Sequence, residues 1–389
     1  MKLFHISDLH IGKQLYYYNL RDNQVEILSQ IVEKAKDYRP DVIIIAGDIY
    51  DKSVPSAEAY TIFGSFLNDL SEITPTIPIL IIAGNHDSAE RLQYASTFLE
   101  KHHIYISVLP PQTEEEHLKK VVVKDKHGEV DFYLLPFTKP GYVRHLFEEG
   151  VVTSYDTAIA ALLGREEIDY DRRNVLISHQ FYISGDKQPQ TCESEQVYIS
   201  VGGIDSVDTS SVRQFDYVAL GHIHGPQQIG EKHIRYCGTP LKYSVSEEKH
   251  IKSITMVTLE AKGEDIILEQ LLLSARQEVR REQGTLSEVI SRATIENRND
   301  FVSILLTDED DIYKPKDQLE EHYNFILEVK VENSRTRAQF ENTAGEATAL
   351  DPFEAFREFY QEMNNVPMNS DEEKLMSEII DRVKEAENL

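Results

Sequence analysis

The chain has 389 residues, which exceeds the usual length of one domain and predicts one large domain with one or two smaller ones. Its 41% hydrophobic content is that of a globular protein and excludes a disordered or fibrous chain. With 40 basic and 67 acidic residues the formal net charge is −27, whereas a protein that binds DNA alone usually carries a basic surface. A role on DNA would therefore require local basic loops, metal ions or a partner subunit.

Membrane segments and disulfides are not expected. No apolar run approaches the roughly 20 residues that cross a bilayer, so we expect no membrane span and a cytoplasmic protein. The two cysteines, Cys192 and Cys237, are too few for a disulfide framework and lie outside any Cys-x-x-Cys pair. Both are expected to be reduced thiols.

Short apolar runs alternate with helix-like stretches through the first 260 residues, a pattern typical of an α/β or layered α/β/β/α domain. The runs that predict strands are Leu3–Ser7, Val42–Ala46, Ile79–Ala83, Val175–Ser178, Tyr217–Leu220 and Ile254–Leu259. Between them, Gln24–Tyr38 and Ala57–Leu70 carry apolar residues at helical spacing, and each ends before a proline. We expect these helices to cover the sheet.

A second, smaller α/β unit begins near Arg280. Thr285 and Glu288 stand at the spacing of a capping box and predict the start of a helix at Leu286–Arg292. The strand-like runs that follow this helix are Val302–Thr307 and Phe325–Val331.

The C-terminal part of the chain begins with a polar stretch, Glu332–Thr348, that predicts a linker. Two amphipathic helices are expected after it. The first carries Phe353, Phe356 and Tyr360, and the second, capped by Ser370 and Glu373, carries Met376, Ile379, Ile380 and Val383. The expected domains are residues 1–275, 276–345 and 346–389.

Five predicted strands end in clusters of Asp, Asn or His. The clusters are Asp8 with His10, Asp48 with Asp51, Asn85 with His86 and Asp87, His179 alone, and His222 with His224. Residues just past the carboxyl ends of neighbouring strands meet at one crevice, so these side chains are expected to converge. Gly47, Gly84 and Gly221 would allow the tight turns that aim them.

Each cluster alone also has a simpler explanation. An Asp-x-His pair often lies by chance on a solvated loop, and Gly-Asp-x-x-Asp is often a turn. A lone histidine such as His179 is more often a hydrogen-bonded core residue, and Gly-His-x-His can be an edge-strand coincidence. All five clusters in this order, each at a strand end, favour a shared polar site over coincidence.

The ordered clusters resemble the motifs of the calcineurin-like metallophosphoesterase superfamily over residues 1–260. The blocks that resemble its SbcD branch are Ser7–Lys13, Gly47–Asp51 with Pro55 and Ser56, and Tyr236–Ser244 with Glu247. The domain order and the helix that opens at Asp351-Pro352-Phe353 are also similar to that branch. The resemblance implies a layered α/β/β/α metallophosphoesterase sandwich, a small α/β capping domain and C-terminal partner-binding helices.

The resemblance further implies a centre of two divalent metal ions, with manganese favoured and magnesium weaker. The residues that match the two ligand sets are Asp8, His10, Asp48 and His224 for one ion, and Asp48, Asn85, His179 and His222 for the other. The shared carboxylate would hold the ions roughly 3.5–4 Å apart, where they activate an attacking hydroxide and stabilise charge on the phosphate oxygens. On chemical grounds alone, these mixed ligands also suit iron, cobalt or zinc.

Two further residues would take part in catalysis according to this resemblance. His86 adjoins the ligand Asn85 but holds no metal, which leaves its imidazole free to protonate or stabilise the departing oxygen. Asp51 would orient that imidazole and favour its charged form.

The implied function is a DNA nuclease that acts with an SbcC-type ATPase in DNA repair and recombination. Its expected activities are 3′–5′ exonuclease cleavage of double strands and endonuclease cleavage of single strands and hairpins. Alternatives are a small-molecule or cyclic-nucleotide phosphodiesterase on the same metals, and a scaffold that kept only the fold. The filled metal positions disfavour the scaffold, while the extra module and tail favour a polymer substrate and a protein partner.

The resemblance also implies an assembly, a homodimer within a heterotetramer. The C-terminal helices would grip the coiled coil of the ATPase, although packing within the chain is a simpler role for them. The helices near Arg91–Lys101 and Tyr142–Leu163 are candidates for the dimer contact.

Overall fold

The computed structural model describes residues 1–195, 199–200, 203–204, 206–333, 353, 356–357, 359–361 and 366–387. The predicted linker Glu332–Thr348 lies outside the described residues except for its first two, as do residues 346–352 at the start of the expected third domain. None of the helices in the described parts of the chain is long and apolar enough to cross a membrane.

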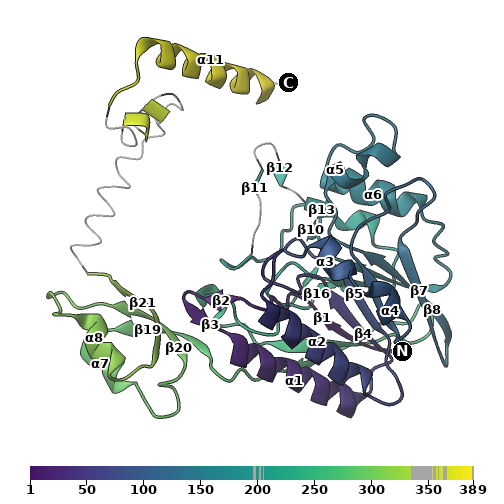
Figure 1. Cartoon of the computed structure of the whole chain (residues 1–389), viewed down its shortest axis with the longest axis horizontal. Helices are drawn as coiled ribbons and strands as arrows, with labels where there is room; N and C mark the ends of the chain where they lie inside the picture. Colours follow the sequence, from purple (N-terminus) through teal and green to yellow (C-terminus); the bar gives the residue numbers. More distant parts are fainter. Residues whose placement is uncertain are drawn as a thin grey trace.

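A six-stranded sheet forms the first half of the main body (Figure 1). Its strands in spatial order are β18 (Ile267–Leu272), β17 (Ser253–Thr258), β1 (Lys2–Ile6), β4 (Val42–Ala46), β5 (Ile79–Ile82) and β6 (Ile104–Ser107). The last four run parallel, while β17 and β18 add an antiparallel edge. On the outer face, α1 (Arg21–Tyr38) and α2 (Ala57–Ser71) pack through residues such as Ile31 and Phe63.

A second six-stranded sheet forms the other half of the body. Its strands in spatial order are β15 (Gln227–Ile229), β16 (Glu231–Tyr236), β14 (Tyr217–Leu220), β9 (Arg173–Ser178), β8 (Gly128–Leu135) and β7 (Lys119–Asp125). Its outer face is covered by α6 (Tyr155–Arg165), whose Ile159 and Leu162 join one core with Leu176 and Val218. A capping box at Ser154 begins that helix.

The inner faces of the two sheets pack against each other. Val42 and Ile44 from the first sheet share a buried core with Phe132, Val175 and Ile177 from the second. Central strands such as β4 are apolar at every position because both of their faces are covered, and each such side chain contributes about 1.5–3 kcal/mol on burial. The layered α/β/β/α architecture is confirmed.

The predicted elements agree with the structure to within a few residues at their ends. β4 and β14 match the predicted strands, and α1 begins three residues earlier than the periodicity indicated, at Arg21. The shorter elements are β2 (Gln14–Leu15), β3 (Tyr18–Asn19), α3 (Ala89–Gln93), α4 (Ser96–Glu100), α5 (Pro140–Val143), η1 (Arg144–Leu146), β10 (Phe181–Ile183), β11 (Ile199–Ser200), β12 (Gly203–Ile204), β13 (Ser206–Asp208), η2 (Thr209–Ser211) and η3 (Val245–Glu247).

A smaller unit, which we call the capping module, lies beside the body (Figure 1). Its elements are the parallel strands β19 (Val279–Gly284), β20 (Phe301–Leu306) and β21 (Phe325–Val331), with α7 (Leu286–Ser291) and α8 (Pro315–Glu320). The capping box of Thr285 and Glu288 is confirmed. Because Val302, Leu319 and Tyr323 belong to a core separate from those of the body, we propose 276–345 as a domain.

The last described helix, α11 (Ser370–Glu387), is capped one residue earlier than predicted. Asn369 Oδ1 accepts from the Glu372 N–H at 3.1 Å, and Glu372 Oε2 accepts from the Asn369 N–H at 2.8 Å. The predicted Ser370 and Glu373 cap is therefore wrong. Asn369 takes the role because its side chain returns the same reciprocal pair of hydrogen bonds, which makes Ser370 the first helical residue.

A partly buried ion pair ties β7 to β9 and to Met1. Asp125 accepts from the Arg173 guanidinium at 2.5 and 3.0 Å, and its Oδ2 lies 2.8 Å from the Met1 amine. The Arg173 guanidinium, and then the Met1 amine, hold the pKa of the Asp125 carboxyl well below its ordinary value. Ionised Asp125 therefore stabilises the fold above its unfolded pKa, and this contribution is lost as the pH falls through the acidic range.

We predict that Asp125→Asn lowers the free energy of unfolding by about 1–3 kcal/mol at pH 7, because it weakens a partly buried charged contact. The difference from the unsubstituted protein should shrink toward pH 3. Urea unfolding at both values measures this, with exposed Asp265→Asn as the matched control. A difference that stayed constant with pH would contradict the pairing.

Candidate metal centre

The five polar clusters come together where the two sheets meet. Asp8, Asp48 and Asn85 follow β1, β4 and β5, which are parallel neighbours in the first sheet. His179 and His222 follow β9 and β14, which are parallel neighbours in the second sheet. The carboxyl ends of both strand sets therefore supply one site, and residues 214 positions apart, such as Asp8 and His222, form direct hydrogen bonds.

Two buried carboxylates lie at the middle of this site. The Asp8 side chain is 0% exposed and accepts from the Ser7 hydroxyl and from the His222 N–H, the latter at 3.1 and 3.0 Å. Asp48 is 2% exposed, and its Oδ1 accepts from the His86 N–H at 2.9 Å. Both carboxylates retain oxygen lone pairs that face the surrounding imidazoles.

One half of the site gathers Asp8, His10 and His224, whose ligand atoms lie within 4.8 Å of one another. The Nε2 atoms of His10 and His224 face each other at 3.3 Å, and His10 Nε2 is 3.7 Å from Asp48 Oδ2. Two imidazole nitrogens aimed at one point are the arrangement expected around a shared cation.

The other half gathers His179, His222 and Asn85 around Asp48. His179 Nε2 is 3.3 Å from Asp48 Oδ2 and 3.2 Å from Asn85 Oδ1. The same amide oxygen lies 3.0 Å from His222 Nδ1. Asp48 therefore faces both halves, the position that a shared carboxylate requires.

The buried carboxylates and imidazoles of the site shift one another's pKa values. Burial lowers the pKa of His179, but the carboxylates of Asp48 and Asp8 outweigh burial and raise it to about 9. The imidazolium of His179 in turn holds the pKa of Asp48 below its ordinary value against burial. Burial, followed by the charge on His179, lowers the pKa of His222 to about 3. Burial raises the pKa of Asp8 as well, so both carboxyl groups of the site favour nearby positive charge.

This donor set fits divalent metal ions. His179 Nδ1 donates to the Ala46 carbonyl at 2.7 Å, so its Nε2 is the nitrogen available to a cation once that proton leaves. Carboxylate, amide and imidazole donors together suit borderline divalent cations. Every predicted ligand is present at the site, and their assignment to individual ions remains a proposal.

Several donors occupy an unusual backbone conformation. The φ angles are 52° at Asp8, 42° at His10, 51° at Asp48 and 95° at His222, all in the left-handed region that non-glycine residues rarely adopt. Such a conformation costs about 1–3 kcal/mol and persists where the surrounding structure over-determines it. These conformations occur in the loops that follow β1, β4 and β14, and no sequence pattern indicated them.

The structure corrects the predicted contact between His86 and Asp51. His86 Nδ1 donates to the main-chain carbonyl of Asp51 at 2.8 Å, not to its carboxylate. The Asp51 carboxylate pairs with Lys13 Nζ at 2.8 Å and lies 3.7 Å from His10 Nδ1. The main-chain carbonyl of Asp51 lies within hydrogen-bond distance of His86 and orients its imidazole. The Asp51 side chain instead pairs with the ammonium group of Lys13.

Sequence reasoning gave no role to Asp87, Ser194, Glu195 or Lys252. Asp87 accepts from the backbone N–H groups of Gly84, Ile49 and Tyr50 at 2.9, 3.1 and 3.0 Å, which joins the loops after β4 and β5. Its place directly after the Gly-Asn-His motif was a signal that could have found it. The other three surround His224 and lie outside every strand-end cluster, so only the tertiary structure reveals them.

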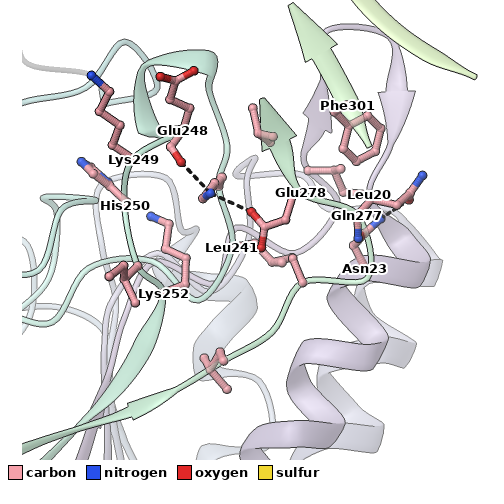
Figure 2. Close-up of a pocket in the computed structure, with 15 residues that line it drawn as sticks. Leu20, Asn23, Leu241, Glu248, Lys249, His250, Lys252, Gln277, Glu278 and Phe301 are labelled. Carbon is pink, nitrogen blue, oxygen red and sulfur yellow. Dashed lines mark hydrogen bonds and ion pairs between the residues drawn. The ribbon is translucent and has the colours of Figure 1, made fainter. Parts of the chain in front are cut away.

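A cleft of about 300 Å³ lies between the body and the capping module, and none of the proposed metal ligands is among the residues that line it (Figure 2). On its wall, Lys242 Nζ donates to the Glu248 carbonyl and to the Glu278 carboxylate, both at 2.7 Å, which joins body and module. Lys252 also lines this cleft, although its ammonium group bonds toward His224.

Comparisons with known proteins show the family of this chain. Residues 1–226 match the family model of calcineurin-like phosphoesterases. Over 331 residues the chain is 34% identical to the SbcD subunit of the nuclease SbcCD from Staphylococcus epidermidis, covering 84% of each protein. The chain belongs to the SbcD family of calcineurin-like phosphoesterases. It is therefore a hydrolytic enzyme of the phosphoesterase class, and the family implies divalent metal ions at its site.

Other matches extend over the rest of the SbcD-family chain. Residues 275–364 match a model described as the type 5 capsule protein repressor C-terminal domain. The chain is 29% identical over 383 residues to the SbcD subunit of the nuclease SbcCD from Staphylococcus saprophyticus, covering 98% of each protein. A dimetal phosphatase from Danio rerio covers 71% of this chain and 99% of its own, with a TM-score of 0.41 and 11% identity.

Close packing at Gly84 leads to a prediction about metal binding. A Cβ atom on Gly84 would lie 2.2 Å from Asp48 Oδ1 and 2.4 Å from the Asp48 nitrogen, so the shared carboxylate would have to move. We expect Gly84→Ala to lose at least one metal ion, measured by elemental analysis after dialysis. Gly64→Ala in α2 is the control, because its Cβ meets nothing within 4 Å and should stabilise the helix by about 0.5–1 kcal/mol. Full metal content in Gly84→Ala would show that Asp48 tolerates displacement.

Proposed function

We propose that this SbcD-family protein is a nuclease that uses two metal ions to cleave phosphodiester bonds of DNA. The observation that carries the proposal is the convergence of two buried carboxylates, four imidazoles and an amide at the shared edge of the two sheets. The Staphylococcus relatives are named as parts of a nuclease, SbcCD, which supports a polynucleotide substrate over other phosphate esters.

The ligand sets proposed for the two ions follow the two halves of the site. The residues that would hold them are Asp8, His10, Asp48 and His224 for one ion, and Asp48, Asn85, His179 and His222 for the other. When bound, the ions lower the pKa of the attacking water and stabilise charge on the phosphate oxygens. We propose manganese, with magnesium weaker.

The chain's own contribution to proton transfer is assigned to His86. Its Nδ1 donates to the Asp51 carbonyl, so Nε2 is the nitrogen left to carry a proton to the departing oxygen. Asp51 acts through its main chain, and its carboxylate anchors Lys13 at the rim of the site. His86 also lies within 4.8 Å of the donors of His10 and Asp48, which places it beside the reacting groups.

The net charge of −27 supports action within a larger assembly. An SbcC-type ATPase would supply most contacts to the DNA phosphates, because the chain itself repels them. With that partner we propose 3′–5′ exonuclease activity on double-stranded ends and endonuclease activity on hairpins and single strands, in DNA repair and recombination.

The C-terminal helices are the proposed contact with the ATPase coiled coil. In Figure 1 α11 lies apart from the other described elements, and its Leu375 and Ile379, one turn apart, are 60% and 44% exposed. Phe353, Phe356 and Tyr360 belong to the preceding helical segment and would act as aromatic anchors in the same groove.

A homodimer within a heterotetramer completes the proposed assembly. The helices α3 and α4 fall in the predicted contact region, and Tyr94 and Phe98 there are 84% and 61% exposed. Aromatic side chains exposed this far beside an apolar pocket support a protein contact.

Digestion assays with manganese on duplex, hairpin and single-stranded DNA, with a cyclic nucleotide in parallel, test the proposed substrate. We expect metal-dependent cleavage of DNA and none of the cyclic nucleotide. Hydrolysis of the cyclic nucleotide alone would replace the nuclease proposal with a small-molecule phosphodiesterase.

The different roles proposed for His86, as a proton donor, and for Asn85, as a metal ligand, give a second test. His86→Ala should keep both metal ions but cut DNA about 10²–10⁴-fold more slowly, because it removes only the proton donor. Asn85→Ala should lose an ion, because it removes an amide oxygen that faces two imidazoles. Metal content and single-turnover cleavage rates distinguish the two variants. Loss of metal from His86→Ala, or a normal cutting rate, would reassign His86.

Exposed apolar residues of α11 give a third test. Replacing Leu375 and Ile379 together by Asp should abolish co-purification with the ATPase, because charges would enter the docking face. Metal-dependent nicking of single-stranded DNA should persist, because the metal centre is untouched. Ser377→Asp, on the same helix, is the control for added charge. Unchanged ATPase binding by the double variant would place the docking site elsewhere.

A further inference from the structure

The outer nitrogen of His224 is held by a hydroxyl from a distant loop. Ser194 Oγ lies 2.7 Å from His224 Nδ1 and donates to Glu247 Oε1 at 2.6 Å. The direct distance from His224 Nδ1 to Glu247 Oε1 is 3.5 Å, too long for a good hydrogen bond. Ser194 therefore bridges a gap that the glutamate cannot close alone.

The single proton of the Ser194 hydroxyl determines which ring nitrogen of His224 carries a hydrogen. That proton is directed to Glu247, so the serine oxygen can only accept from His224 Nδ1–H. Nε2 then keeps its lone pair, and Nε2 is the atom that faces His10 across the site. The bridge selects the tautomer that can bind a cation.

Glu247 is itself rigidly held. It is 0% exposed, and Lys252 Nζ donates to its Oε2 at 2.6 Å. The same ammonium donates to the His224 carbonyl at 3.1 Å, so Lys252 binds both ends of the bridge. Both carboxylate oxygens of Glu247 are therefore held, Oε1 by Ser194 and Oε2 by Lys252.

The loop that carries Ser194 is fastened both to the turn at His224 and to η3. Glu195 Oε1 accepts from the His224 N–H at 2.6 Å, and Ser246 Oγ accepts from the Glu193 N–H at 3.0 Å. The Glu195 contact, made by the residue next to Ser194, places the Ser194 hydroxyl beside His224, whereas Ser246 holds the loop two residues from Glu195.

The corresponding nitrogen in the other half of the site has a different support. His179 Nδ1 donates directly to the Ala46 carbonyl of β4, which is part of the rigid sheet. One imidazole is thus oriented by the sheet and the other by a loop side chain. The two halves of the centre therefore differ in the group that orients the metal-binding imidazole.

We propose that Ser194 is a positioning residue that fixes the tautomer of His224 and thereby controls metal binding in the half of the site formed by Asp8, His10 and His224. The inference rests on the two-metal proposal above. Groups that orient metal-binding histidines typically change metal affinity 10–100-fold when they are removed. Because His179 does not use this bridge, the effect is confined to one ion.

Manganese titration of the metal-free, full-length protein tests the inference, with free Mn²⁺ followed by its electron paramagnetic resonance signal. The unsubstituted chain should bind two ions. Ser194→Ala should bind one ion as before and the other 10–100-fold more weakly. Ser194→Thr, which keeps a hydroxyl, should restore both affinities.

Ser246→Ala is the matched control. Its hydroxyl anchors the same loop at Glu193 but does not touch His224, so both affinities should remain normal. If Ser246→Ala weakens one ion as Ser194→Ala does, the loop merely supports the fold and the inference is overturned. Threonine failing to rescue, or both ions weakening equally in Ser194→Ala, would also overturn it.

The titration separates this inference from the proposed function. If the unsubstituted chain binds fewer than two ions, the two-metal proposal fails and the positioning role fails with it. If it binds two ions and Ser194→Ala retains both affinities, only the positioning role fails.

Discussion

The carboxylates of Asp8 and Asp48 are buried together, and their need for nearby positive charge determines much of the surrounding structure. Like charges in a region of low dielectric are strongly unfavourable unless cations or hydrogen-bond donors compensate them. In the described structure the backbone N–H groups of His86 and His222 donate to these carboxylates, and the carboxylates raise the pKa of the neighbouring His179. A pair of divalent ions would supply positive charge beside both carboxylates.

Placing these carboxylates side by side constrains the backbone around them. Asp8 and Asp48 adopt left-handed conformations that strands and helices avoid, and Gly84 must lack a side chain for Asp48 to fit. Asp87 then joins the loops through three backbone donors, which holds the strained segments in position. The energy stored at these turns is offset by the two apolar sheets, whose cores leave the loop ends little freedom to relax.

The donors around these carboxylates are positioned by two different parts of the structure, the sheets and a loop. The rigid sheets position most donors, while the loop with Ser194 and the Lys252–Glu247 pair support His224 from outside the sheet. Lys252 also lines the cleft between the body and the capping module, where Figure 2 labels it. The outer support of one metal ligand therefore adjoins the boundary between the body and the capping module.

The order of apolar runs and polar clusters was enough to predict the layered fold and the residues that converge, because strand ends are local features and parallel strands align their carboxyl ends. Sequence could not show that the first three clusters belong to one sheet and the last two to another, because strand pairing depends on contacts far apart along the chain. The prediction that the Asp51 carboxylate contacts His86 was wrong, because the contact is made by the Asp51 main-chain carbonyl. A sequence motif names the residue but does not show whether its main chain or its side chain makes a contact. Ser194, Glu195 and Lys252 were found only by tertiary structure, because they follow no strand-end pattern and reach His224 through folding of loops. Sequence by itself determined which chemical groups were available, whereas the packing of the two sheets decided which atoms of those groups face one another.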